Sequence, residues 1–156
     1  DPAGQLHCFP MRARDRLLLF LALDGAPRGL DPVRLQKGMF LDAMTGGTNV
    51  GEAYSFVPYN YGPMSAQIYS DLETLVAEDL VEEVPVQGQS WSRYMATEKG
   101  MQAGRELMSR QPSDEVAQSL YRIKKEVAAK TFKALLEDVY DRYPEYAEKS
   151  VFRRDD

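Results

Sequence analysis

Few residues in this sequence have the types and spacing that chemistry requires. His7 and Cys8 are the only histidine and the only cysteine, and they are neighbours. Such a pair can act as base and nucleophile or as metal ligands, but a terminal segment containing proline and glycine does not hold a fixed geometry. We therefore expect residues 1–11 to form a flexible leader. Met11 is an alternative natural start, which leaves open whether residues 1–10 are native.

Acidic and glycine pairs elsewhere do not match the patterns of catalytic or phosphate-binding sites. Glu82 and Glu83 fall in a short β-like run, where neighbouring side chains point to opposite faces and cannot cooperate easily. Gly46-Gly47 lacks the Gly-Lys-Ser/Thr that completes a phosphate loop. A single cysteine excludes an intramolecular disulfide and a multi-cysteine zinc site. We predict a protein that is not an enzyme and has no cofactor or metal.

The composition is that of an ordinary soluble protein, with 44% hydrophobic and 28% charged residues. A net charge of −5 argues against broad, nonspecific binding to nucleic acids, which requires lysines and arginines to displace counterions. It does not exclude a local basic surface. The longest apolar run, Leu17 to Leu23, is far too short to span a bilayer. We expect a cytoplasmic protein that does not enter the membrane.

The elements that would position functional residues centre on Tyr61 to Gly100. A helix is expected from about Pro63 to Leu80, because proline suits the first turn of a helix and apolar residues follow at helical steps. These apolar residues are Ile68, Leu72, Leu75 and Val76. Residues 81–86 and 91–96 then read as two strands joined by a turn that contains Gly88. Thr97 to Gly100 opens another helix.

Two helices are expected before this stretch and two after it. Residues 12–23 predict a buried helix, and Asp31-Pro32 predicts the start of a second helix that ends at Thr45-Gly46-Gly47, with Arg34 and Lys37 outside. An extended aromatic segment follows at residues 52–62. A helix at 101–111 precedes a long one that begins with Ser113 as its N-cap and runs to about Tyr143.

Two sets of motifs resemble known families. The run I-Y-S-D-L-E-T-L-V-A-E-D-L-V-E-E followed by R-Y-M-A-T-E-K-G resembles PadR and MarR regulators. The segments R-L-Q-K-G-M-F-L, Y-S-F-V-P-Y-N-Y-G-P-M-S-A-Q-I-Y-S-D-L and V-Y-D-R-Y-P-E-Y-A resemble the YwgA-like and Panacea (SocA antitoxin-like) prokaryotic families. Both resemblances imply a winged helix-turn-helix, that is, a mainly α protein with a small β-hairpin (α+β). The second divides its functional implication between regulators and toxin-neutralising partners.

The PadR resemblance also implies a role for the C-terminal helix. We expect a winged-helix domain at 12–111, a C-terminal helix at 112–149 and a short tail at 150–156. In PadR-like proteins the C-terminal helix pairs two subunits, so a homodimer is expected through its apolar stripe. This stripe consists of Val116, Leu120, Ile123, Val127, Leu135 and Val139. The alternative is a helix folded back over its own domain.

The leading functional hypothesis is a dimeric, DNA-binding transcriptional regulator. The helix at 63–80 would enter the major groove, and Gln67 would be its best base reader because a glutamine amide can pair with adenine in both directions. The remaining groove-facing residues would be Ser65, Ser70 and Thr74. The phosphate contacts would come from Gln89, Trp91 and Arg93 on the wing and from Arg34 and Lys37.

Charge opposes this hypothesis and favours a rival. Residues 63–80 contain four acids and no lysine or arginine, so duplex DNA repels that helix. A protein-interaction module of the antitoxin type would instead offer the acidic helix to a basic protein partner. The aromatic segment at 54–61 could serve as its docking surface. For those aromatic residues, stacking on nucleic-acid bases and packing as a wall between helices are further alternatives.

Overall fold

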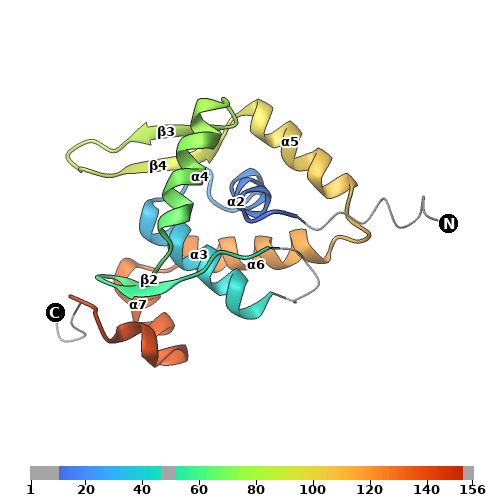
Figure 1. The fold of residues 1–156 in the computed structure, drawn as a ribbon. Coiled ribbons are helices and arrows are strands. Elements are labelled where there is room, and N and C mark those ends of the chain that lie inside the picture. Colours follow the sequence, from blue (N-terminus) through green and yellow to red (C-terminus); the bar gives the residue numbers. More distant parts are fainter. Residues whose placement is uncertain (1–10, 47–51, 153–156) are drawn as a thin grey trace.

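The computed structural model describes residues 11–46 and 52–152 (Figure 1). His7 and Cys8 therefore lie outside the described residues. The expected α+β class is confirmed, because helices dominate and the described strands form two small antiparallel sheets. In chain order the elements are α2 (Ala13–Ala22), α3 (Pro32–Thr45), β1 (Val57–Tyr59), β2 (Gly62–Met64), α4 (Ala66–Ala77), β3 (Val81–Pro85), β4 (Ser92–Ala96), α5 (Glu98–Ser109), α6 (Glu115–Ala129), α7 (Phe132–Arg142) and the 3-10 helix η2 (Pro144–Ala147).

The first two helices form where the sequence predicts them. Residues 17–21 of α2 are buried, as expected of a helix that is apolar on nearly all sides. The carboxylate of Asp31 accepts a hydrogen bond of 3.0 Å from the backbone N–H of Arg34, and Pro32 occupies the first helical position of α3. A buried ion pair between Arg16 and Asp42, with Nε and Oδ2 2.8 Å apart, holds α2 against α3.

The predicted helix and hairpin are also present. Ile68, Leu72 and Leu75 bury one face of α4, and β3 pairs with β4 in a register that sets Val81 opposite Ala96. Leu30 adds a single bridge to the outer edge of β4 through backbone bonds of 2.9 and 2.8 Å to Tyr94. The segment before α3 is therefore fastened to the hairpin.

The start of α4 differs from the prediction. Residues 62–64 form strand β2, which pairs with β1, and the helix begins only at Ala66. Pro63 is tolerated in β2 because it lies in a short two-stranded sheet, where only one neighbour needs its hydrogen bonds. Ser65 precedes the helix, but its hydroxyl caps nothing. Its backbone N–H and C=O instead bind the amide of Gln36, each at 2.9 Å.

The single long C-terminal helix is wrong. The chain leaves the helical conformation at Lys130, and the hydroxyl of Thr131 starts α7 by accepting a hydrogen bond of 3.1 Å from the N–H of Ala134. The ammonium of Lys130 bridges Glu126 and Asp138 across this break, which stabilises the bend. At the other end, α6 begins after Asp114, and the Ser113 hydroxyl accepts only a long bond from the N–H of Glu115.

The predicted dimerisation stripe is buried inside its own chain. All six of its residues are at most 8% exposed and belong to one hydrophobic core with residues of α2, α3 and α4. The assignment of this stripe to a subunit interface is therefore wrong, and the folded-back alternative describes the molecule. The break at Lys130 makes this possible, because it turns α7 back toward α3 and the β1–β2 hairpin.

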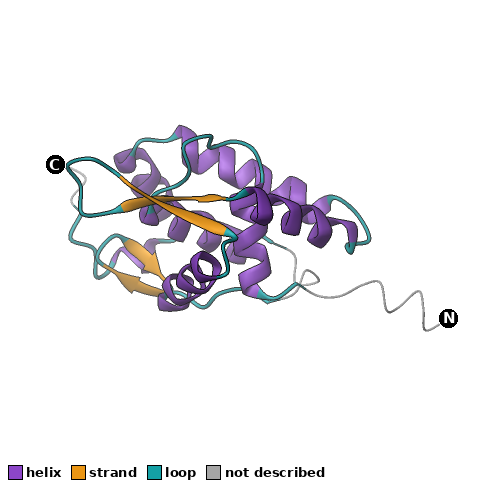
Figure 2. Ribbon diagram, turned by 90° about the horizontal axis from the view of Figure 1, so that it is seen from above, coloured by secondary structure: helices purple, strands orange, loops and turns teal. Residues whose placement is uncertain are grey.

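In Figure 1 the β1–β2 hairpin lies at the start of α4 and the β3–β4 hairpin near its end, and both extend toward the left of the view. Figure 2 shows both pairs of strands, in orange, in the half of the molecule that holds the C-terminus. The edge of Phe132 in α7 meets the ring of Tyr61, and the N–H of Val151 bonds to the carbonyl of Asn60, which holds the β1–β2 hairpin in place. No helix among the described residues is long and apolar enough to cross a bilayer.

Candidate functional site

The residues predicted to read DNA do not all face outward. Gln67 and Ser70 are exposed on α4 and Thr74 is half-buried, and the amide of Gln67 donates to the carboxylate of Asp71 at 2.9 Å. Ser65 is only 4% exposed, because its backbone is bound to Gln36. The prediction that Ser65 faces a DNA groove is therefore wrong.

The two predicted phosphate contacts on α3 serve the fold. The side chain of Lys37 is 3% exposed and donates to the carbonyl of Pro63 at 3.1 Å, and burial lowers its pKa to about 7. Arg34 is half-buried and donates to the carboxylate of Asp31 and to the carbonyls of Val127 and Lys130. The expectation that both cations remain outside is wrong for Lys37, and the guanidinium of Arg34 is occupied.

The predicted residues of the hairpin differ in exposure. Gln89 and Trp91 are exposed near the tip, whereas Arg93 is half-buried in β4. Neighbouring residues of a strand point to opposite faces. The hydroxyl of Tyr94 bonds to Glu83, and Tyr69 and Glu73 of α4 help to raise its pKa, whereas Arg93 lines a hollow on the other side of the strand. An α4-bound duplex and the side chain of Arg93 are thus on different sides of the sheet.

Only part of the aromatic segment at 54–61 is available for docking. Tyr54 is buried and its hydroxyl donates to Asp71 at 2.6 Å, and Phe56 packs edge-on against Phe40 with centroids 5.4 Å apart. This half of the segment is the packed wall that the sequence suggested. Tyr59 and Tyr61, each 44% exposed, face outward from the β1–β2 hairpin.

A hollow of about 280 Å³ lies between this hairpin, the first two turns of α3 and the first turn of α4. Three exposed tyrosines line it: Tyr59, Tyr61 and Tyr69. The amide of Gln36 and the buried amine of Lys37 form part of its floor. Because burial lowers the pKa of Lys37 to about 7, this amine is only partly protonated near neutral pH.

Tyr69 connects the hollow to the hairpin β3–β4. The hydroxyl of Tyr94 donates to the carboxylate of Glu83 at 3.2 Å. The pKa of Tyr94 is raised to about 12, first by burial and then by Glu83, Tyr69 and Glu73. The carboxylates of Glu73 and Glu83 are both exposed. We call the surface formed by Tyr59, Tyr61, Tyr69, Tyr94, Glu73 and Glu83 the tyrosine–acid face.

No lysine or arginine occurs between Lys37 and Arg93 in the sequence. Strands β1 to β3 and helix α4 all lie in that interval, so they bring no cation to the tyrosine–acid face. Sequence reasoning noted the acidic character of α4. It missed Tyr69 and Tyr94, because they come from different elements and no local pattern links them.

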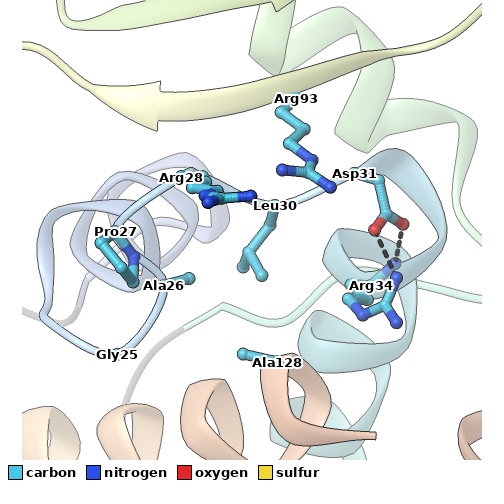
Figure 3. A pocket seen from close by; sticks show the side chains of 10 residues that line it. Gly25, Ala26, Pro27, Arg28, Leu30, Asp31, Arg34, Arg93 and Ala128 are labelled. Atoms are coloured by element: carbon cyan, nitrogen blue, oxygen red, sulfur yellow. Dashed lines mark hydrogen bonds and ion pairs between the residues drawn. The ribbon is translucent and has the colours of Figure 1, made fainter. Parts of the chain in front are cut away.

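A second hollow, of about 320 Å³, lies on the other side of the hairpin (Figure 3). It is lined by Arg28 of the loop after α2, Arg34 of α3 and Arg93 of β4, with Asp31 as its one carboxylate. We call it the arginine pocket. Arg28 gave no signal in the sequence, since a single arginine in a turn is ordinary.

A scan of protein families and a search of curated proteins find no match for this chain. Among the described residues, no three His, Cys, Asp or Glu side chains come together as metal ligands. Function is therefore inferred from the chain's own surfaces.

Proposed function

We propose that this chain is a winged-helix protein-interaction module that binds a basic polypeptide on its tyrosine–acid face. The order of α2, the bridging residue Leu30, α3, α4 and the β3–β4 hairpin is the order of elements in a winged helix-turn-helix. In this proposal α4 and the hairpin keep the scaffold of a DNA-binding domain but serve a protein partner.

The observation that carries the proposal is the charge of this face. DNA-binding proteins neutralise several phosphates with lysines and arginines, and this neutralisation supplies much of their affinity. Here Glu73 and Glu83 are exposed, α4 contains no cation, and Lys37 and Arg34 are held by the fold. Duplex DNA would be repelled, whereas lysines and arginines of a partner would be attracted.

The tyrosines favour a polypeptide for a second reason. Tyrosine is enriched where proteins bind one another, because its ring offers a large apolar area and its hydroxyl a hydrogen bond. A partner's lysine or arginine can also lie over the ring of Tyr59, Tyr61 or Tyr69 in a cation–π contact. The hollow between these rings is large enough to take one anchoring side chain. Burial lowers the pKa of Lys37 to about 7, so the floor repels a cation less than an ordinary lysine would.

Fluorescence anisotropy with two labelled probes tests the proposal at low salt. One probe is a peptide of alternating basic and apolar residues, and the other is duplex DNA from upstream of the gene. We expect the peptide to bind and the duplex not to bind. The double variant Glu73→Lys/Glu83→Lys should lose the peptide, because its face becomes basic.

The matched control is Glu145→Lys/Glu148→Lys. It makes the same change in net charge at two exposed residues in and after η2. This control should bind the peptide as the unmodified chain does. If both double variants lose peptide binding equally, net charge alone explains the loss, and the proposal is overturned. Salt-sensitive binding of the unmodified chain to the duplex, with base preference relaxed by Gln67→Ala, would instead establish the DNA-binding regulator.

A further inference from the structure

The arginine pocket brings together cations that an acidic protein would be expected to keep apart. Its charged lining consists of three arginines and one aspartate, which leaves two positive charges in a single hollow. Arg28 is exposed and Arg93 half-buried, and within the described residues neither guanidinium has a hydrogen bond or an ion pair. In Figure 3 the side chains of Arg28 and Arg93 both extend into the hollow that Leu30 also lines. The one carboxylate of the described lining, Asp31, is bound by Arg34.

The backbone fixes the segment that carries Arg28 against strand β4. Gly29 adopts a positive φ of +84°, and a Cβ at this residue would lie 2.6 Å from the carbonyl oxygen of Tyr94. Only glycine can come this close to β4 in this conformation. The two backbone bonds between Leu30 and Tyr94 then fix the segment against the strand. Arg28 and Arg93 lie on either side of this fixed contact, and both line the hollow beside it.

Arg34 forms the rigid side of the pocket. Its guanidinium donates to the carboxylate of Asp31 at 2.6 Å and to the carbonyl of Lys130 at 2.7 Å, and its Nε donates to the carbonyl of Val127. Arg34 thus contributes charge while its position is fixed by α3 and by the end of α6. Arg28 and Arg93 remain available to a ligand.

We propose that the arginine pocket binds a phosphate group. Planar guanidinium groups match the oxygens of phosphate in paired hydrogen bonds, and such charge-assisted bonds are stronger than neutral ones. The two uncompensated positive charges match a phosphate dianion. The pocket is separate from the tyrosine–acid face, since Arg93 and Tyr94 point to opposite sides of β4. This proposal therefore does not depend on the proposed function.

Isothermal titration calorimetry of the full chain at constant ionic strength tests the proposal with inorganic phosphate and with a nucleoside 5′-monophosphate. We expect one site, and we expect Arg28→Ala/Arg93→Ala to weaken binding at least about a hundredfold, since each charged hydrogen-bonding partner is worth about tenfold. Equal affinity for both probes would identify the phosphate alone as the ligand. Tighter binding of the monophosphate would identify an esterified phosphate.

The matched control is Arg105→Ala/Arg122→Ala, which removes the same charge from exposed residues of α5 and α6. It should bind the better probe as tightly as the unmodified chain. The proposal is overturned if neither probe binds the unmodified chain. It is also overturned if the Arg28/Arg93 double variant binds as tightly as the control. Circular dichroism of the variants ensures that a loss of binding is not a loss of folding.

Discussion

The two sides of the β3–β4 hairpin carry opposite charge although they share the same strands. On the side of α4 lie tyrosines and acids, with Glu73 and Glu83 exposed. On the other side Arg28 and Arg93 line a pocket whose one carboxylate, Asp31, is bound by Arg34. A single residue step in β4, from Arg93 to Tyr94, separates the two environments. One sheet therefore offers surfaces for two chemically different ligands.

The comparison shows that net charge describes this molecule poorly. Several cationic side chains are buried and stabilise the fold. Arg16 pairs with Asp42, and the buried amine of Lys124 donates to carbonyls at the end of α2. Lys37 and Arg34 are used in the same way. Around the hairpin, the exposed acids lie on one side and the available arginines on the other. Each proposal can therefore be tested by changing the charges of one side alone.

The largest effect on stability is expected when Arg34, the arginine of the pocket that holds the fold together, is replaced. Arg34→Ala removes the donor to three acceptors, so it should lower the free energy of unfolding by about 3 kcal/mol. Arg28→Ala should change it by less than about 0.5 kcal/mol, as exposed side chains without partners usually do. Urea denaturation measures both. Equal losses would contradict the division of roles within the pocket.

The next effect concerns the contact between the loop and β4. Gly29 and Gly88 both have positive φ. A Cβ on Gly29 would meet the backbone of Tyr94, whereas a Cβ on Gly88 would have no atom within 4 Å. Gly88→Ala should cost about 1 kcal/mol from conformation alone. Gly29→Ala should cost about 2 kcal/mol or more, because something must also move. Thermal denaturation compares them, and a smaller loss for Gly29→Ala would show that the loop does not hold Arg28 against the strand.

A pH series tests whether the floor under the tyrosines is uncharged. The pKa of Lys37 is about 7 in the folded chain against an ordinary 10.5, so between pH 7 and 9 the unfolded chain binds more protons. Stability should therefore rise with pH over this interval, by up to about 1.4 kcal/mol per pH unit for this lysine. Lys124, with a pKa of about 8, adds a similar rise in every variant that keeps it.

The variant Lys37→Met should lose the contribution of Lys37 and retain that of Lys124. Urea denaturation at pH 7, 8 and 9 gives the slope for each protein. A slope unchanged by the substitution would mean that Lys37 is charged in the folded chain, and the hollow would then repel a basic anchor.

The smallest effect on stability is expected on the tyrosine–acid face. Glu73→Lys/Glu83→Lys should change the free energy of unfolding by no more than about 1 kcal/mol, since exposed charges contribute little. Calorimetric unfolding measures it. A much larger loss would assign these acids to holding the hairpin against α4 and would remove the basis for treating the face as a binding surface.

Much of the fold follows from local sequence patterns. The apolar period of α4, the Asp31-Pro32 start of α3 and the glycine between β3 and β4 each act within a few residues, and each predicts the observed element. At the break after Ala129 the one local signal is the N-cap residue Thr131, since neither proline nor glycine lies near it. The break is stabilised by side chains from elsewhere, including Arg34 of α3.

The candidate sites depend even more on tertiary contacts. Lys37 follows Arg34 by one helical turn and looks like a second surface cation, and only the approach of Pro63 explains its burial. The tyrosine–acid face is assembled from two hairpins and a helix, and the arginine pocket from a loop, a helix and a strand. Sequence patterns reach a few residues along the chain, whereas Arg28 and Arg93 are 65 residues apart and Tyr59 and Tyr94 are 35 residues apart.

Site-specific photo-crosslinking tests the central claim most directly. A photoreactive phenylalanine analogue replaces Tyr69 on the tyrosine–acid face or, as a control, the similarly exposed Tyr121 of α6, and the full-length protein is irradiated in its own cells. The claim predicts an adduct with one basic polypeptide at Tyr69, absent at Tyr121 and abolished by Glu73→Lys/Glu83→Lys. An adduct between Tyr69 and duplex DNA, or the same polypeptide captured at both positions, would contradict it.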